Sequence, residues 1–171
     1  MDLNLDLALS ATAALVFAPF VWAICLHVAW SDLSAMKIRN TMVLALAGVF
    51  VLLGPVLMPL DTYGWRLVTM VATLAVTFVL NAAGVMGAGD SKFIAAAAPY
   101  IAPPDVFFVM ILFAACLLGA FVTHRAARVT GIGPRLAPGW ESWTRKRDFP
   151  MGFPLGGTLA IYLCLALFFG A

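Results

Sequence analysis

Charged residues are scarce in this sequence: only 11% of its 171 residues are Asp, Glu, Lys or Arg. A soluble domain usually carries about a quarter. Hydrophobic residues make up 64% of the chain, and the mean hydropathy is +1.03. This balance excludes an ordinary soluble domain and indicates an integral membrane protein. The length predicts a single domain over 1–171, without a separate soluble module.

Cysteine is also scarce, and the N-terminal segment lacks Lys and Arg. The three cysteines, Cys25, Cys116 and Cys164, lie inside apolar runs and form no CxxC pair. They therefore suggest neither a zinc site nor a disulfide framework. The first apolar run has no basic flank and is too long for a cleavable signal peptide. We expect it to remain as a transmembrane helix, and we expect neither a cofactor nor a nucleic-acid partner.

Six apolar runs predict an all-α protein with six transmembrane helices, since a spanning helix needs about 20 residues. The expected spans are 8–30, 41–60, 67–86, 90–102, 106–123 and 152–170. The fourth run is short: a helix from Asp90 to Pro103 would rise only about 20 Å, whereas the hydrocarbon core is about 30 Å thick. Either this helix crosses incompletely, or Asp90 begins it from a position recessed into the membrane.

Basic residues gather in alternate connections. Nine of the ten Lys and Arg residues follow the first, third and fifth spans, and only Arg66 falls on the other side. The opposite side collects acidic residues: Asp2, Asp6, Asp61 and Asp105. By the positive-inside rule, the basic connections face the cytoplasm and both termini face outward. The long basic loop 124–150, which includes Lys146 and Arg147, is expected to anchor on anionic lipid headgroups.

Two aspartates at the expected cytoplasmic face are candidates for chemistry, because a carboxylate close to hydrocarbon is costly to keep. Asp90 follows Gly87-Ala88-Gly89, and Asp32 lies in the polar connection after the first span. Two carboxylates held close together can share one proton. The ionised one can then take a proton from water while the protonated one polarises a peptide carbonyl.

Each aspartate also has a purely structural interpretation. Asp90 could cap the fourth helix, and Asp32 could cap a short helix in the first cytoplasmic loop. Two such residues on one face, one of them behind a Gly-x-Gly turn, favour a functional pair. The glycines are expected to allow backbone dihedrals closed to other residues and to let another segment approach closely.

Three short motifs resemble those of the type IV prepilin peptidases, a family of membrane-embedded aspartyl proteases. The segment 87–92, Gly-Ala-Gly-Asp-Ser-Lys, matches the family's GxGDxK form. The family's first aspartate is followed by an Ile-Pro-Asn triplet, and here Ile38-Arg39-Asn40 begins six residues after Asp32. Segment 150–154, Pro-Met-Gly-Phe-Pro, is similar to the start of the family's last helix.

The resemblance implies a catalytic pair, Asp32 and Asp90, in a bacterial inner-membrane aspartyl endopeptidase. The residues expected to shape its site are Gly87, Gly89, Lys92, Ile38 and Asn40. Lys92 could favour the ionised form of Asp90 or could reach lipid headgroups. The implied substrate is a prepilin or pseudopilin with a short basic leader and an apolar helix, cut on the cytoplasmic side just before that helix.

The sequence also bears on the type of peptidase. Larger members of the family carry paired CxxC motifs and an N-methyltransferase activity, and this chain has no CxxC. It therefore resembles the short form associated with Tad/Flp-type pili. Two other functions stay open: a small proton- or cation-coupled transporter, and a non-catalytic scaffold for pilus assembly. A transporter is expected to show broken helices in two matching halves, whereas this sequence has one Gly-broken point and no repeat.

Overall fold

The computed structural model describes residues 6–145 and 148–171, and within them the chain forms seven α-helices and no strand. They are α1 Ala11–Ala35, α2 Asn40–Leu57, α3 Leu60–Ala82, α4 Ala88–Ala97, α5 Val106–Val129, α6 Ile132–Leu136 and α7 Gly152–Phe169. The expectations for Asp2, Lys146 and Arg147 fall outside the described residues.

Five of these helices, α1, α2, α3, α5 and α7, are long and apolar enough to cross a membrane. The prediction of a helical membrane protein is thus confirmed. The fourth expected span is not a sixth such helix, because α4 has only 10 residues and continues into the 3-10 turns Ala98–Tyr100 and Pro103–Asp105. Prolines account for the break, since proline has no N–H to donate and disfavours helix in the residue before it. A sixth crossing stays a prediction.

Two helix boundaries differ from those expected. Helix α1 continues past the apolar run to Ala35, so Asp32 lies in its last turn and not in a polar connection. Helix α3 begins at Leu60 and includes residues 61–66, which lie between the second and third expected spans. Hydropathy marks where apolar side chains stop, whereas a helix ends where its backbone hydrogen bonds end. Pro19 lies inside α1 and does not end it.

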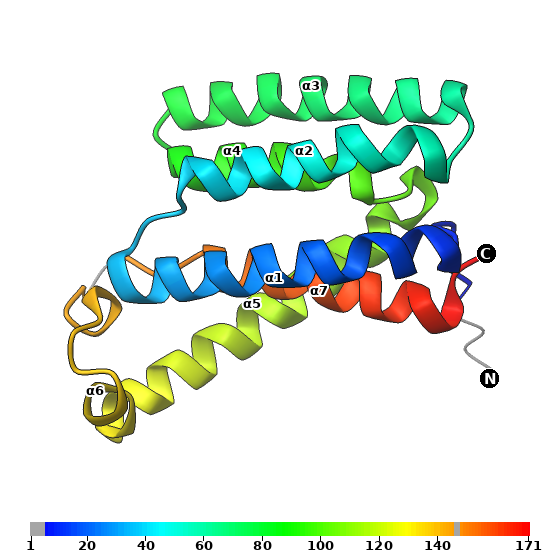
Figure 1. Ribbon diagram of the computed structural model, residues 1–171. Coiled ribbons are helices and arrows are strands. Elements are labelled where there is room, and N and C mark those ends of the chain that lie inside the picture. The colour runs from blue at the N-terminus through cyan, green and yellow to red at the C-terminus, as the bar shows by residue number, and fades with distance from the viewer. Residues whose placement is uncertain (1–5, 146–147) are drawn as a thin grey trace.

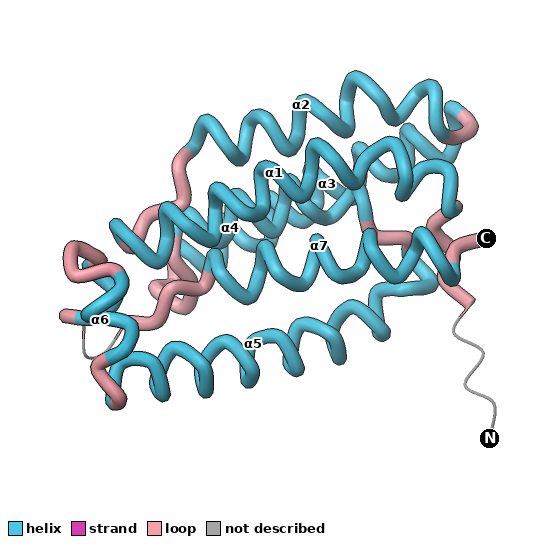
Figure 2. The backbone as a smooth tube through the Cα atoms, turned by 60° about the horizontal axis from the view of Figure 1, so that its bottom comes forward, coloured by secondary structure: helices cyan, strands magenta, loops and turns pink. Residues whose placement is uncertain are grey.

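Helices α1 and α7 lie side by side in the middle of the bundle, with α2, α3 and α4 on one side and α5 on the other (Figure 1). On the first side, α2 and α4 lie next to α1 and α7, and α3 packs on α4 from outside. Figure 2 shows α6 at the far end of α5. The core is centred where α1 and α2 meet the chain after α4. There the rings of Phe17, Phe50 and Tyr100 contact one another, and all three are fully buried.

Both described chain ends lie at one end of the bundle, opposite the end where α1 stops and α4 starts (Figure 1). The Leu7 N–H donates to the Phe169 carbonyl at 2.8 Å, and the Ala171 N–H donates to the Leu7 carbonyl at 3.0 Å. Asp105, only 4% exposed, accepts the Ala8 N–H at 2.9 Å and the Tyr162 hydroxyl at 2.7 Å.

Arg66 is buried in the same end cluster, where it donates to the carbonyls of Pro99 and Ile101. Arg66 and Asp105 were expected in connections between spans on the outward side, and both side chains are buried. Helix α3 begins earlier than expected, and this carries the Arg66 side chain onto the chain that follows α4. The hydrogen bonds of the cluster offset part of the cost of this burial, but Nε of Arg66 has no partner among the described residues.

Candidate active site

Asp32 lies in the last turn of α1 and is held by the first residue of α7. Its side chain is buried, with 5% exposure, and its Oδ2 accepts the Gly152 N–H at 2.6 Å. The first N–H groups of a helix have no partner within the helix and carry partial positive charge. Helix α7 therefore presents its N-terminus to the Asp32 carboxylate and stabilises the ionised form.

Glycine is required at position 152 because the two helices approach so closely there. A Cβ atom at Gly152 would lie 3.0 Å from both Cβ and Oδ2 of Asp32. That is too close for ordinary van der Waals contact, so any larger residue would push Asp32 or the start of α7 away. The position belongs to the Pro-Met-Gly-Phe-Pro segment, but the motif gave no reason to pair Gly152 with Asp32.

Asp90 is the third residue of α4, three positions after the N-cap residue Gly87. A carboxylate in the first turn of a helix is favourable. Gly87 has an ordinary extended backbone, with φ −66° and ψ 145°, so the expected special dihedral is wrong at this position. Its role is steric: a Cβ atom at Gly87 would lie 2.7 Å from Oδ2 of Asp90. The positive φ in this turn belongs to Gly84, at 74°.

Gly89 brings the two aspartate motifs into contact. A Cβ atom at Gly89 would lie 3.2 Å from Cβ of Ile38, so glycine lets the Ile38-Arg39-Asn40 segment pack against the first turn of α4. Arg39 has φ −74°, within the range to which proline is restricted. The Arg that replaces Pro in the resembling triplet therefore keeps a proline-like backbone.

Lys92 and Asn40 form a second link between the motifs. The Lys92 ammonium donates to Oδ1 of Asn40 at 3.1 Å, joining α4 to the first residue of α2. Neither role considered for Lys92 includes this contact. All five residues expected to shape the site, Gly87, Gly89, Lys92, Ile38 and Asn40, thus lie where α2 and α4 begin.

Helix α4 is fixed against α3 by a reciprocal pair of hydrogen bonds. The Thr77 hydroxyl donates to the Ser91 carbonyl at 3.1 Å, and the Ser91 hydroxyl donates to the Thr77 carbonyl at 3.0 Å. In the turn before α4, the Asn81 amide donates to the Met86 carbonyl at 2.8 Å. Because Ser91 follows Asp90 directly, these bonds set the position of the carboxylate.

Both aspartates line one cavity of about 270 Å³. One wall is the end of α1 with residues 36–38, another is residues 87–90, and a third is Phe149 with Met151. The sequence motifs had not indicated Phe149 or Met151 as wall residues. Among the described residues, no three His, Cys, Asp or Glu side chains gather as a metal site would require.

Asp90 lies outside the five candidate spans, and its surroundings favour the protonated form. Burial raises the pKa of Asp90 to about 6, and the negative charge of Asp32 acts in the same direction. A backbone hydrogen bond from Gly87 lowers this pKa and partly opposes the shift. The arrangement therefore holds one carboxylate at a helix N-terminus and a second one that keeps a proton up to about pH 6.

The sequence around both aspartates also matches a known protein family. The model of the type IV leader peptidase family matches residues 19–124, more than half of the chain and a range that contains both aspartates. The chain belongs to the type IV leader peptidase family. No curated protein and no solved structure gives a significant match. The family assigns the protein to the leader peptidase type of protease.

The matched range of this leader peptidase ends before Gly152 and before the third wall of the cavity. That wall is supported by aromatic contacts. The Phe149 ring lies 5.8 Å from that of Phe121 and 5.7 Å from that of His124, both near the end of α5. His124 in turn stacks on Trp143 with ring centres 4.7 Å apart.

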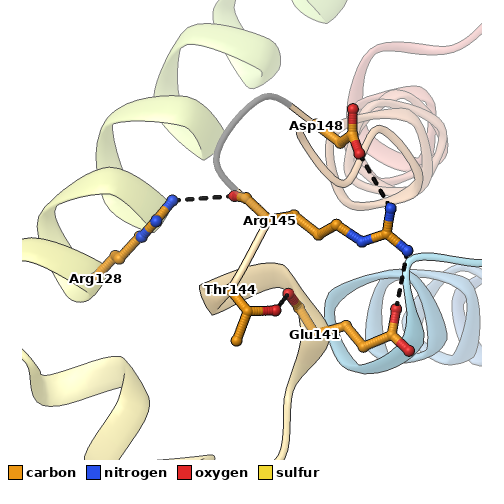
Figure 3. Close-up of polar contacts among 5 residues, drawn as sticks. All are labelled: Arg128, Glu141, Thr144, Arg145 and Asp148. Atoms are coloured by element: carbon orange, nitrogen blue, oxygen red, sulfur yellow. Dashed lines mark hydrogen bonds and ion pairs between the residues drawn. The ribbon is translucent and has the colours of Figure 1, made fainter.

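The chain before Phe149 is held by exposed charged groups (Figure 3). The Arg145 guanidinium lies between Glu141, at 3.6 Å, and Asp148, at 3.4 Å, while Arg128 of α5 donates to the Arg145 carbonyl at 3.1 Å. Exposed ion pairs contribute little stability each. Both ion pairs lie within the loop, and the Arg128 bond joins the loop to α5. Phe149, four residues after Arg145, lines the active-site cavity.

Proposed function

We propose that this protein is a membrane-embedded aspartyl endopeptidase that removes the leader of a prepilin or pseudopilin. The observation that carries the proposal is the single cavity lined by Asp32 and Asp90, which are 58 residues apart in sequence (90 − 32). Family membership supports proteolysis of leader sequences in general. On this basis we propose the catalytic pair and the substrate class.

The surroundings of the two aspartates suggest different roles. Asp32, which accepts the N–H of Gly152 at the start of α7, acts as the ionised base and takes a proton from water. The water oxygen attacks the carbonyl carbon of the scissile peptide bond, and protonated Asp90 gives its proton to the carbonyl oxygen. Electrostatic separation of two neighbouring carboxylates in this way is a known basis for acid–base pairs.

The second half of the reaction restores both groups. The tetrahedral intermediate collapses when the C–N bond breaks, and the proton held by Asp32 goes to the leaving amine. Asp90 recovers a proton from the hydroxyl that becomes the new carbonyl oxygen. No bond forms between enzyme and substrate, and the products are a carboxylic acid and an amine.

The distribution of basic residues supports activity at the cytoplasmic face of a bacterial inner membrane. Lys37 and Ile38 line the cavity, and Arg39 and Lys92 lie beside it. Positive charge of this kind stays on the cytoplasmic side. The absence of CxxC from the sequence supports a short Tad/Flp-type peptidase without N-methyltransferase activity.

Co-expression with a Flp-type prepilin tests the proposal. Asp32→Asn and Asp90→Asn keep the size of the side chain and remove its charge, and each is expected to abolish the gel shift of the processed prepilin. Asp61→Asn is the matched control, because Asp61 is exposed in the first turn of α3, and it should process normally. Normal processing by either active-site variant at equal membrane levels would exclude that residue from catalysis. A wild type that cuts no prepilin would favour the transporter or the scaffold.

A further inference from the structure

A groove of about 480 Å³ runs between α2 and α3 and is lined almost entirely by apolar side chains. It exists because α2 and α3 both pack on α4 and hardly touch each other. Leu44 of α2 and Val71 of α3 form its sides and are 70% and 63% exposed. Ala95 and Ala96 of α4, both buried, also line it.

The groove ends where the active-site cavity begins. Asn40 and Lys92, whose side chains are hydrogen-bonded at 3.1 Å, line the end of the groove. Ile38 and Asp90, each two residues before one of that pair, line the cavity. A peptide bound along the apolar groove would therefore cross the Asn40–Lys92 hydrogen bond and enter the cavity that holds the two aspartates.

We propose that this groove binds the apolar helix of the substrate and that the Asn40–Lys92 pair marks the point where the substrate leaves the helix. The inference rests on the proposed function, which supplies a substrate with an apolar helix next to the bond that is cut. Small residues let transmembrane helices approach closely, and Ala47, Ala95 and Ala96 provide them here. The groove takes the side chains along one face of a helix.

The polar end of the groove suits the peptide next to the helix. Hydrolysis needs an extended backbone in the cavity, and an extended backbone has carbonyl groups without helical partners. The Lys92 ammonium has three N–H donors, of which one bonds to Asn40. The other two have no hydrogen-bond partner among the described residues and can bind substrate carbonyls at this end of the groove. Lys92 is thus assigned to substrate positioning.

A second groove, between α1 and α7, serves as the control site for substitutions in the α2–α3 groove. Its volume is about 340 Å³, and none of the described residues that line it is charged. The Trp22 indole N–H donates to the Ala160 carbonyl at 3.0 Å, so a side chain already bridges the two helices. Leu26 lines this groove and is 73% exposed, which makes it a matched position for substitution.

Filling each groove with a bulky side chain tests the inference. Leu44→Trp and Val71→Trp are made on exposed positions of the α2–α3 groove, and Leu26→Trp is made in the second groove. With purified protein and a full-length prepilin, the first two variants should raise KM at least tenfold with kcat within twofold of wild type. Leu26→Trp should change neither constant. Unchanged KM in both α2–α3 variants, or a larger rise with Leu26→Trp, would overturn the inference.

Cross-linking provides a second measurement that needs no turnover. In a chain with Asp90→Asn and its own cysteines replaced by Ala, Val71→Cys should form a disulfide with a single cysteine in the substrate helix. Leu26→Cys should not. Cross-linking through Leu26→Cys alone would place the helix in the second groove and overturn the inference. If wild type cuts no prepilin, both the proposed function and this inference are wrong. If wild type and the Trp variants cut prepilin equally well, only the assignment of the substrate helix to the α2–α3 groove is wrong.

Discussion

At the scale of residues, Asp32 and Asp90 differ only in what surrounds them. Asp32 receives a short hydrogen bond, 2.6 Å, from the first N–H of a long helix. Asp90 sits on a short helix, half-buried, and feels the charge of Asp32. The Gly152 hydrogen bond favours negative charge on Asp32, whereas the surroundings of Asp90 favour its proton. In the proposed reaction these two groups are the base and the acid.

The pKa of Asp90 predicts how activity depends on pH. Because Asp90 must be protonated to act as the acid, kcat/KM for prepilin cleavage should fall as pH rises through about 6. Well above that midpoint the fall is about tenfold for each pH unit. The measurement is cleavage by purified protein between pH 5 and about pH 8. A rate that stays constant across this range would contradict the role of Asp90 as the acid.

The same shift predicts a change in stability. The pKa of Asp90 in the fold, about 6, lies above its ordinary value of 3.8, so the fold binds this proton more tightly than the unfolded chain does. Ionisation of Asp90 therefore lowers the free energy of unfolding. This loss is absent below the ordinary pKa and complete above about pH 6. The unfolding temperature of Asp90→Asn minus that of wild type should be larger at pH 7 than at pH 4. Equal differences at the two pH values would contradict the shift.

At the scale of elements, the site depends on where two helices begin. Helix α4 begins at Ala88 and carries Asp90 in its first turn, and α7 begins at Gly152 and binds Asp32. In both cases glycine removes a Cβ atom that would collide with the carboxylate, at Gly87 for Asp90 and at Gly152 for Asp32. The resemblance had drawn attention to the first glycine. The second has the same function on the other aspartate.

Gly152→Ala tests this arrangement. The added Cβ atom would lie 3.0 Å from the Asp32 carboxylate oxygen, so Asp32 or α7 must move, and a displacement of this kind costs about 100-fold in rate when it misplaces a catalytic group. We expect kcat to fall by about 10- to 100-fold. Gly157→Ala on the same helix is the control, because a Cβ atom there meets nothing within 4 Å. Full activity of Gly152→Ala would show that the contact is not needed for catalysis.

At the scale of the whole molecule, the two ends of the bundle have separate polar clusters. One holds the aspartate pair, and the other holds Asp105, Tyr162 and Arg66 with the two described chain ends (Figure 1). The second cluster fastens the segment before α1 to the start of α5 and to α7. We therefore expect it to serve stability, without a direct part in the reaction.

Asp105→Ala should separate stability from activity. The variant loses an acceptor for the N–H groups of Ala8 and Leu9 and for the Tyr162 hydroxyl, and each buried group left without a partner costs about 1–3 kcal/mol. Thermal unfolding in detergent should therefore shift to clearly lower temperature. The kcat/KM of the folded fraction should stay within twofold of wild type. Exposed Asp61→Ala is the control for unfolding, and a loss of kcat/KM in Asp105→Ala would reveal coupling between the two ends.

The sequence by itself determined the class of the protein and the residues to consider. Hydropathy is a local property, so the apolar runs could be read as membrane helices, and five of them have the length and composition to span. The motifs around Asp32 and Asp90 are also local. Their spacing was sufficient to suggest the family to which the chain belongs. The boundaries of α1 and α3 were wrong because a change in hydropathy does not fix the last backbone hydrogen bond of a helix.

Only the tertiary structure decided which groups meet. Asp32 binds Gly152, 120 residues away, and Ile38 packs on Gly89 because the glycine leaves room for it. The burial of Arg66 and Asp105 in one cluster likewise follows from the packing of α3 and α7 against the chain after α4. Hydropathy predicts that a helix is removed from water, but it does not predict which neighbouring helix packs on each of its faces. Close approach between backbones and side chains selects the neighbour, and that selection is made only when the helices pack.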